Sequence, residues 1–289
     1  MRGYRCKTRG DYRSGVSSSQ TTKTDGQPGP QPPAIEAWSD SDLAANPHAR
    51  LDKPAKVQAM FASIARSYDL NNRLHSLWRD QAWRRFAVRQ ANVRPSDVVL
   101  DVATGTGDLA EAFARAGAAK VIGLDFTYEM LSIAKRRASK LRETGEAAAA
   151  DRTTYIQGDA QKLPIADSSV DVVSIAFGIR NVLDPSAAIR ENRRVLRPGG
   201  RLVILEFAEP RLAPIRWFND LYCRRIMPRT ATWISGDRSG AYKYLPKSVQ
   251  TFVTPEQMRK MLEEAGFREV RTWGLSLGIC VCYRALVEG

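Results

Sequence analysis

Apolar positions recur along the chain with two different periods, and these periods predict its helices and strands. From Lys56 to Tyr68 they follow the i, i+3, i+4, i+7 spacing of one helix face, and residues 77–92 form a second helical stretch. Beyond them, short apolar runs typical of buried strands alternate with helical segments. The predicted strands are 98–102, 120–125, 154–158, 170–176, 201–207, 268–273 and 279–286. The predicted helices are 108–117, 128–141 and 185–196. A last helix begins at the capping box of residues 254–257 and ends at 265.

This alternation predicts the architecture of the chain. Strands that alternate with helices imply right-handed crossovers, so we expect an α/β fold with a Rossmann-like, mostly parallel sheet of seven strands. Two helices precede the first strand and can fold over its carboxyl end as a lid. A lid insertion of about 45 residues, Ala208 to Val253, precedes the last helix. In such a sheet, ligands bind at the carboxyl ends of the strands.

A glycine-containing turn follows the first predicted strand. The segment from Val98 to Asp108 reads VVLDVATGTGD, in which Gly105 and Gly107 permit positive φ and the close approach of a ligand. Asp125 ends the next strand, at the distance where an acid can accept both hydroxyls of a ribose. A glycine turn combined with such an acid predicts an adenosine-type cofactor.

Two further acids bear on which adenosine cofactor is bound. The segment GTGDLA also satisfies the dinucleotide pattern G-x-G-x-x-G/A, so a nicotinamide-dependent dehydrogenase is one alternative. Asp101, just before the turn, can accept from the ammonium of an amino acid but would face a pyrophosphate unfavourably. Asp159, after the third strand, is placed to meet an adenine amino group. Acids at three successive strand tips therefore favour S-adenosylmethionine.

Composition narrows the partners and the compartment. With 44 Lys+Arg against 31 Asp+Glu the chain carries +13, which favours an anionic partner, either nucleic acid or an anionic lipid surface. There is no run of about 18 apolar residues and no apolar segment near Met1, so we expect neither a membrane span nor a secretory signal. The four cysteines contain no C-x-x-C pair, and we expect a reducing, cytoplasmic location and no metal site.

The N-terminal segment differs in composition from the rest of the chain. Residues 1–33 are basic and rich in Ser and Thr, then in Pro and Gly, with almost no apolar side chains. We expect a disordered basic tail and linker over residues 1–50, followed by a single catalytic domain over residues 51–289. A transit peptide is the alternative for the tail; its two acids and its lack of an apolar face favour a plain tail.

The insertion carries an apolar face bordered by arginines. Between Arg211 and Trp233, five arginines and a single acid, Asp220, accompany apolar and aromatic side chains. This pattern is typical of a helix that lies in a bilayer interface, and it also fits a lid packed on the sheet. Peripheral association with an anionic membrane is one expectation and a packed lid is the other. The apolar side chains are Ile215, Trp217, Phe218, Leu221, Tyr222, Ile226 and Trp233.

Several stretches between residues 56 and 285 are more particular than the fold requires. They read DVATGTGDLA, GLDFTYEML, IAFGIRNV, RVLRPGGRLVILEF and ISGDRSGAYKYLPKSV. On these stretches the chain resembles the UbiE/MenG/Coq5 family of class I methyltransferases, which C-methylate polyprenylated quinols. The resemblance implies S-adenosylmethionine as cofactor and a polyprenyl quinol as substrate, either demethylmenaquinol of menaquinone biosynthesis or a benzoquinol of ubiquinone biosynthesis. An RNA methyltransferase is a further alternative. The aromatic residues of the insertion do not follow the pattern that a nucleic-acid-binding groove would need, so we expect no nucleic-acid partner.

The resemblance also implies a cofactor site. Two acids at strand tips, a hydroxyl and backbone atoms contact the cofactor, and the glycine turn shapes its methionine end. The contacting residues are Thr106, Asp125, Asp159, Ala160 and the main chain at Ala176, and the turn residues are Asp101, Gly105 and Gly107.

The catalytic residues are less clear from the sequence. Family members often carry His where this chain has Asp80 and Tyr283. The two histidines of this chain, His48 and His75, fit structural roles better. A histidine side chain is therefore not expected to act as the base. Methylation needs an ionised quinol, and a nearby cation lowers a phenol pKa. Our candidates are therefore Arg180 as the cation and Asn181 as its partner, with a water held by both taking the proton. Tyr242 and Tyr244 either face the ring or pack in the core.

Overall fold

The computed structural model describes residues 37–237 and 239–289. Most of the predicted tail therefore lies outside the described residues. In the described part of the chain, no helix is long and apolar enough to cross a membrane.

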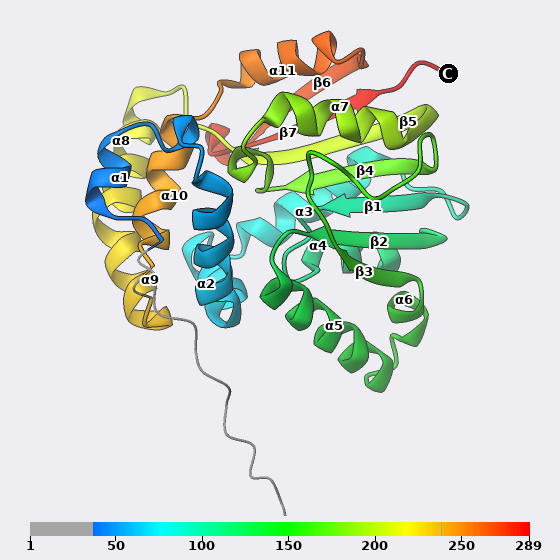
Figure 1. Ribbon diagram of the computed structural model, residues 1–289, viewed down its shortest axis with the longest axis horizontal. Helices are drawn as coiled ribbons and strands as arrows, with labels where there is room; N and C mark the ends of the chain where they lie inside the picture. Colours follow the sequence, from blue (N-terminus) through cyan, green and yellow to red (C-terminus); the bar gives the residue numbers. More distant parts are fainter. Residues whose placement is uncertain (1–36, 238) are drawn as a thin grey trace, which may run out of the picture. The chain divides into compact units, whose positions relative to one another are not determined.

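A seven-stranded sheet forms the centre of the fold (Figure 1). Its strand order is β3-β2-β1-β4-β5-β7-β6, and every pair among the first five strands of this order is parallel. β7 is antiparallel to both β5 and β6, which confirms the mostly parallel sheet of seven strands. The strands are β1 (Val98–Val102), β2 (Lys120–Asp125), β3 (Thr153–Gln157), β4 (Val170–Ala176), β5 (Leu196–Phe207), β6 (Arg268–Leu275) and β7 (Cys280–Leu286).

Helices cover both faces of the sheet, because neighbouring residues of a buried strand point to opposite sides. Val99 joins an apolar cluster with α3, α4 and α5, whereas Leu100 joins a second cluster with α7 and α11. In Figure 1, α7 and α11 lie on one side of the sheet and α3 and α4 on the other. These helices are α3 (Arg79–Ala91), α4 (Asp108–Arg115), α5 (Tyr128–Glu143), the short α6 (Ala147–Asp151), α7 (Pro185–Val195) and α11 (Pro255–Glu264).

A third group of helices lies beyond the carboxyl ends of the strands, as predicted for the first N-terminal helix and the lid insertion; the second N-terminal helix, α3, packs instead on a face of the sheet. Within this group, α2 stands between the other helices and the sheet (Figure 1). A separate apolar cluster, which includes Met60 of α2, Ala231 of α9 and Tyr244 of α10, holds the group together. Its helices are α1 (Asp40–Ala44), α2 (Lys53–His75), α8 (Ala213–Leu221), the π-helical turn η3 (Tyr222–Ile226), α9 (Met227–Ser235) and α10 (Ala241–Gln250); short 3-10 turns are η1 (Pro47–Ala49), η2 (Ile179–Asn181) and η4 (Ser276–Gly278).

Residues 37–50, expected to belong to a disordered linker, are instead packed onto the helical group. Trp38 is 1% exposed, and its ring stacks on Tyr244 with centroids 4.4 Å apart. The Trp38 N–H donates to the Ser239 carbonyl, and Ser39 caps α1 through a capping box. His48 shares a hydrogen bond with the Ser248 carbonyl, which fits the structural role expected for it. The folded domain therefore begins before the expected boundary at residue 51.

The burial of Trp38 leads to a stability prediction. Trp38→Ala should lower the free energy of unfolding by about 3–5 kcal/mol, because it removes a fully buried aromatic side chain and leaves a cavity. Trp233→Ala is the matched control, since that side chain is 86% exposed and its loss should change stability by less than about 0.5 kcal/mol. Urea unfolding followed by circular dichroism measures both. Equal effects of the two substitutions would show that residues 37–50 do not belong to the cooperative fold.

Candidate active site

Two cavities adjoin at the carboxyl ends of the parallel strands. The first, here called the strand-tip cavity, has a volume of about 110 Å³ and is bounded by the ends of β1, β2 and β4 and by α2. The second, here called the lid cavity, has a volume of about 880 Å³ and lies among α2, α3, α8 and α10. The side chains of Phe61, Tyr68 and Phe177 line both cavities, so these aromatic residues mark the junction.

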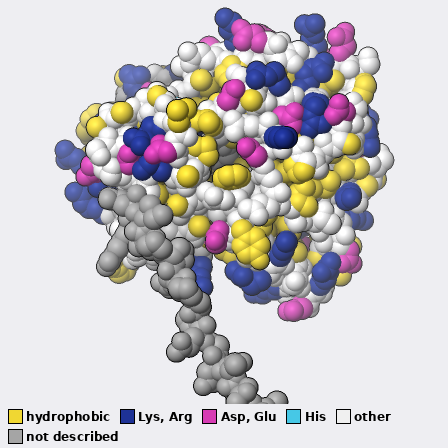
Figure 2. Space-filling model, viewed as in Figure 1, with side chains coloured by type: hydrophobic (Ala, Val, Ile, Leu, Met, Phe, Trp, Pro, Cys, Tyr) yellow, Lys and Arg dark blue, Asp and Glu magenta, His cyan; other side chains and the backbone are white. Residues whose placement is uncertain are grey.

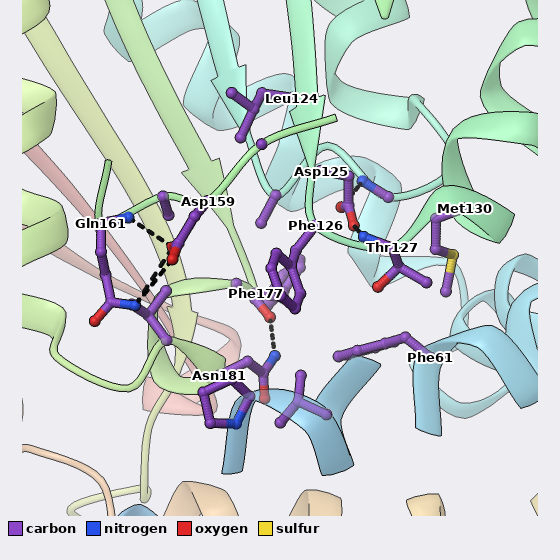
Figure 3. Close-up of a pocket in the computed structure, with 18 of the residues that line it drawn as sticks. Phe61, Leu124, Asp125, Phe126, Thr127, Met130, Asp159, Gln161, Phe177 and Asn181 are labelled. Atoms are coloured by element: carbon purple, nitrogen blue, oxygen red, sulfur yellow. Dashed lines mark hydrogen bonds between the residues drawn. The ribbon is translucent and has the colours of Figure 1, made fainter. Parts of the chain in front are cut away.

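The strand-tip cavity contains two of the predicted acids, as Figure 3 shows. Asp125, at the end of β2, accepts hydrogen bonds from the Gly105 and Thr127 N–H groups, both at 2.8 Å. Its burial raises the pKa of the carboxyl, although these hydrogen bonds act against the rise. Asp159, beyond β3, accepts from the Gln161 N–H at 2.8 Å. Both acids line the cavity and keep free lone pairs for a ligand.

The two turn glycines serve different purposes. Gly105 lines the strand-tip cavity with φ +58°, a conformation that glycine adopts at little cost. Gly107 has φ +90° and does not line the cavity, and a Cβ there would lie 2.5 Å from the Tyr155 hydroxyl oxygen. The requirement for glycine at 107 thus comes from packing, and only Gly105 offers its backbone to a ligand.

Asp101 and Thr106 lie behind the cavity wall and do not line it. Asp101 is 1% exposed and accepts from the Thr104 and Ser174 hydroxyls, both at 2.6 Å. Burial raises the pKa of Asp101 to about 6, although the two hydroxyls oppose the rise. The Thr106 hydroxyl donates to Asp69 of α2 at 2.6 Å. In this arrangement both residues support the turn, whereas the predicted Ala160 and Ala176 do line the cavity.

Helix α2 covers the strand-tip cavity with Pro54, Val57, Phe61 and Tyr68. Lys53, at its start, is fully buried and donates from Nζ to the carbonyls of Arg180 and Val182, at 2.9 and 2.6 Å. Burial lowers the pKa of Lys53 to about 8. These hydrogen bonds hold α2 against the segment after β4. The strand-tip cavity, at about 110 Å³, is smaller than the roughly 300–1,000 Å³ of most ligand sites.

Arg180 and Asn181 open onto different cavities. Arg180 lines the lid cavity and Asn181 the strand-tip cavity. The Arg180 guanidinium, expected to be free beside a substrate, forms a buried ion pair with Glu206, with Nη1 2.5 Å from Oε1. Sequence reasoning missed Glu206 because it is 26 residues away on β5 and reads as part of an apolar strand.

The segment after β4 holds Phe177 in an unusual backbone conformation. Phe177 has φ +58°, which is uncommon for a residue with a side chain. Its carbonyl accepts from Arg180 Nη1 at 2.9 Å and from Asn181 Nδ2 at 3.2 Å, and the second bond is visible in Figure 3. Asn181 in turn accepts from the Tyr244 hydroxyl at 3.0 Å. Both predicted catalytic side chains therefore fix the aromatic residue at the junction.

The lid cavity is mainly apolar inside and has an apolar rim. Leu77, Phe218 and Leu277 line it and are nevertheless 80%, 65% and 69% exposed. Tyr242 and Tyr244 also line it and pack in the third apolar cluster, so core packing is shown and their facing the ring stays a prediction. The other lining side chains include Met60, Ile64, Trp83, Phe207, Ile215, Met227, Leu245 and Val249.

Charged residues at one side of the lid cavity were also missed. Asp80, 3% exposed, accepts from Arg73 and Arg84, at 2.7 and 2.9 Å. Arg84, one of several arginines in residues 77–92, is only 7% exposed. His75 pairs with the Tyr222 hydroxyl at 2.8 Å, and Tyr283 is buried in the sheet core. No three metal-ligating side chains gather within the described residues.

The basic side chains do not form a groove on the face shown in Figure 2. Lys and Arg side chains are scattered over the described residues there, and acidic side chains lie beside many of them. This distribution differs from the continuous basic stripe typical of nucleic-acid-binding domains.

Solved structures with similar folds include SAM-dependent methyltransferases. A SAM-dependent methyltransferase from Thermotoga maritima aligns over 80% of this chain and 99% of its own, with a TM-score of 0.54 and 18% identity. Another, from Aquifex aeolicus, aligns over 81% of this chain and 98% of its own, with a TM-score of 0.51 and 18% identity. These likenesses establish the class I methyltransferase fold.

Sequence relatives are more specific. The demethylmenaquinone methyltransferase of Deinococcus radiodurans is 43% identical over 229 residues, which cover 79% of this chain and 91% of the relative. The ubiquinone/menaquinone biosynthesis C-methyltransferase UbiE of Geobacter sp. (strain M21) is 39% identical over 238 residues, 82% of this chain and 98% of the relative. The family model of the ubiE/COQ5 methyltransferases matches residues 50–286. The chain therefore belongs to the ubiE/COQ5 methyltransferase family.

Proposed function

We propose that the protein transfers the methyl group of S-adenosylmethionine to a ring carbon of a polyprenylated quinol, and that its substrate is demethylmenaquinol. The observation that carries the proposal is the junction of the two cavities: an acid-bearing cavity at the strand tips adjoins a much larger apolar one. The names of the relatives support the reaction, and the name of the Geobacter relative favours a ubiquinone-type benzoquinol as second substrate. Removal of the gene tests the choice, because the quinone that accumulates one methyl short identifies the substrate.

The strand-tip cavity suits the cofactor in the chemistry of its lining. S-adenosylmethionine, when bound, supplies an electrophilic methyl group on a sulfonium. Asp125 would accept the ribose hydroxyls, Asp159 and Ala160 would meet the adenine, and the main chain at Ala176 would contact the cofactor. Gly105 would shape the methionine end directly, and Asp101 and Gly107 would do so by supporting the turn. Thr106, expected to contact the cofactor, donates to Asp69 instead and does not line the cavity. Helix α2 covers this side of the proposed cofactor site.

The lid cavity suits the quinol and the first part of its tail. The cavity has about 880 Å³ and an apolar lining, and each buried CH₂ of the tail gains about 0.8 kcal/mol. A ring bound beside Phe61, Tyr68 and Phe177 would present its carbon to the strand-tip cavity. Rate enhancement then comes chiefly from positioning, because the carbon must attack the methyl in line.

Ionisation of the quinol is the second requirement. If its pKa resembles that of tyrosine, about 10, ionisation at pH 7 costs about 4 kcal/mol. Arg180 would lower this pKa, since a cation beside an oxygen shifts it by about 1–3 units, although Glu206 offsets part of the charge. Arg180 stays protonated, so a water held by Arg180 and Asn181 would accept the proton.

The rim of the lid cavity suits docking on an anionic bilayer. Its exposed apolar side chains come from three separate segments, Leu77 before α3, Phe218 on α8 and Leu277 in η4. Arg79 and Arg216 are exposed beside them, and each arginine near an anionic surface contributes about 1 kcal/mol. A lipid tail could then pass from the bilayer into the cavity without crossing water. In this proposal the insertion is both a lid and an interfacial segment.

The first prediction concerns the cofactor. Asp125→Ala should weaken binding of S-adenosylhomocysteine about tenfold to a hundredfold, because hydrogen bonds to a charged acceptor contribute about 1.5–3 kcal/mol. Isothermal titration calorimetry measures the affinity. Asp167→Ala, which removes an exposed acid that lines neither cavity, should leave it unchanged. If Asp125→Ala binds S-adenosylhomocysteine as tightly as the wild type, Asp125 does not bind the ribose. If the wild type binds NAD more tightly than S-adenosylhomocysteine, a dehydrogenase is favoured.

The second prediction concerns the cation. Arg180→Gln alone would leave Glu206 as an unpaired buried carboxylate at a cost of about 3–5 kcal/mol, so it is combined with Glu206→Gln. The double variant should bind the cofactor normally but turn over about tenfold or more slowly at pH 6, with a smaller loss toward pH 9. The loss shrinks because the quinol ionises unaided as the pH approaches its pKa.

Initial rates from pH 6 to pH 9 check this prediction. Arg142→Gln with Asp151→Asn is the matched control, since it removes an exposed ion pair away from both cavities. Parallel pH profiles for the wild type and the Arg180 double variant would rule out an electrostatic role of Arg180 in ionisation.

The third prediction concerns the membrane. Trp217→Ser with Phe218→Ser should abolish binding to vesicles with anionic headgroups and slow methylation of a long-tailed quinol, while sparing a short-tailed analogue. Both side chains are at least 60% exposed, so the fold should survive. Leu51→Ser, at an 89% exposed side chain outside the cavities, is the control. Co-sedimentation with liposomes measures membrane binding, and methylation assays with the long-tailed and the short-tailed quinol measure activity. Equal loss of activity on both quinols would contradict the interfacial role and support a packed lid only.

A further inference from the structure

Two buried guanidiniums, Arg84 of α3 and Arg180 after β4, line the same lid cavity. We propose that they divide the two oxygens of the acceptor ring between them. Arg180 acts on the hydroxyl next to the methylated carbon, and Arg84 binds the remote hydroxyl as a substrate-binding residue. The inference rests on the proposed function, because it assigns a specificity determinant within that site.

The hydrogen-bonding capacity of Arg84 is largely unused. Within the described residues its guanidinium forms one hydrogen bond, from Nη1 to Asp80 Oδ2 at 2.9 Å. Its buried Nε has no hydrogen-bond acceptor there, and Asp108 Oδ2 lies 3.9 Å from it, beyond hydrogen-bond distance. A buried charged donor without an acceptor is costly. Arg84 Nη2 also forms no hydrogen bond within the described residues, and it is the donor left for a ligand oxygen in the cavity.

Arg180 has the same feature. Its Nη1 donates to the Phe177 carbonyl and to Glu206, and its buried Nε finds no acceptor in the described part of the chain. Each guanidinium is thus charge-paired through Nη1 and carries donors that the protein leaves unused. A quinol ring carries an oxygen at each end, so each of the two cations that line this cavity can take one of them.

Two aromatic rings hold the cations on that wall. The Arg84 Cζ lies 5.3 Å from the centroid of the Phe177 ring, and the Arg180 Cζ lies 5.4 Å from that of the Phe207 ring. The two rings contact each other, with centroids 4.6 Å apart. Contact with an aromatic face orients a guanidinium while leaving its edge available for hydrogen bonds. The wall therefore fixes both cations before a substrate arrives.

A phenol group of the protein indicates how far the two charges act. Tyr68 stands at the junction of the cavities, and burial raises the pKa of its hydroxyl. Both Arg84 and Arg180 act in the opposite direction and lower the pKa of this group. A phenolic oxygen at the junction thus lies within the field of both guanidiniums, and a quinol oxygen has the same chemistry.

The test compares two acceptors with the same prenyl chain: the naphthoquinol and a 1-naphthol that lacks only the remote hydroxyl. For the wild type, kcat/KM should be about tenfold to a hundredfold lower with the 1-naphthol, as expected for loss of a hydrogen bond to a charged group. Arg84→Gln should lower kcat/KM for the quinol by a similar factor, leave the 1-naphthol unaffected and keep the pH profile. The preference between the two acceptors should therefore disappear.

Arg73→Gln is the matched control, because Arg73 also pairs with Asp80 but does not line the lid cavity. It should keep the preference for the quinol. Arg84→Gln removes one of the two cations that pair with Asp80. Should it fail to fold, the double variant Arg84→Gln with Asp80→Asn, which also removes the carboxylate charge, replaces it in the comparison. S-adenosylhomocysteine affinity reports on the integrity of each variant.

Two results would overturn the inference. If Arg84→Gln lowers kcat/KM equally for both acceptors, Arg84 has a structural role only. If the wild type has the same kcat/KM for both acceptors, it does not recognise the remote hydroxyl. Both results leave the proposed function intact. A wild type that methylates neither acceptor would overturn the proposed function and this inference with it.

Discussion

Three cations buried at the carboxyl edge of the sheet constrain everything built there. Lys53, Arg84 and Arg180 are at most 7% exposed, and a buried charge is tolerated only where partners compensate it. Lys53 and Arg180 take their partners from other elements, Lys53 from the carbonyls after β4 and Arg180 from Glu206 on β5. Arg84 pairs with Asp80 one turn earlier on its own helix, α3. Compensation of these charges therefore joins α2, β5 and the segment after β4 into one framework, and α3 packs against it.

That framework explains why Phe177 keeps an unfavourable backbone conformation. A positive φ at a residue with a side chain persists only when its surroundings hold it in place. Here the Phe177 N–H donates to the Leu205 carbonyl at 2.7 Å, and its carbonyl accepts from Arg180 and Asn181. The ring is thereby directed to the point where the cavities meet. The strain is located where two ligands would have to approach each other.

The sequence predicted the periodic parts of the fold and the acids at the strand tips. β1, β2 and β4 have the predicted bounds, because buried parallel strands are continuous apolar runs ending in recognisable residues such as Asp125. Trp38 was missed because Ala37 and Trp38 form only a short apolar pair next to polar residues, without a period. The helices inside the insertion were left unassigned, although Gly236 ends α9 in a left-handed conformation. The Arg180–Glu206 pair and the unused donors of Arg84 depend on which distant residues meet, and no local pattern records that.

The shared use of α2 couples the two cavities. Its residues Phe61 and Tyr68 face both, whereas Met60 and Ile64 pack in the apolar cluster that also contains Tyr242 and Tyr244 of the insertion. An outward movement of α2 that opens the strand-tip cavity would therefore expose part of this cluster and disturb the lid cavity. Apolar burial opposes such exposure, at about 25 cal/mol for each Å². Filling of the lid cavity by an apolar acceptor would add to that burial, so an acceptor should hold α2 closed over the strand-tip cavity.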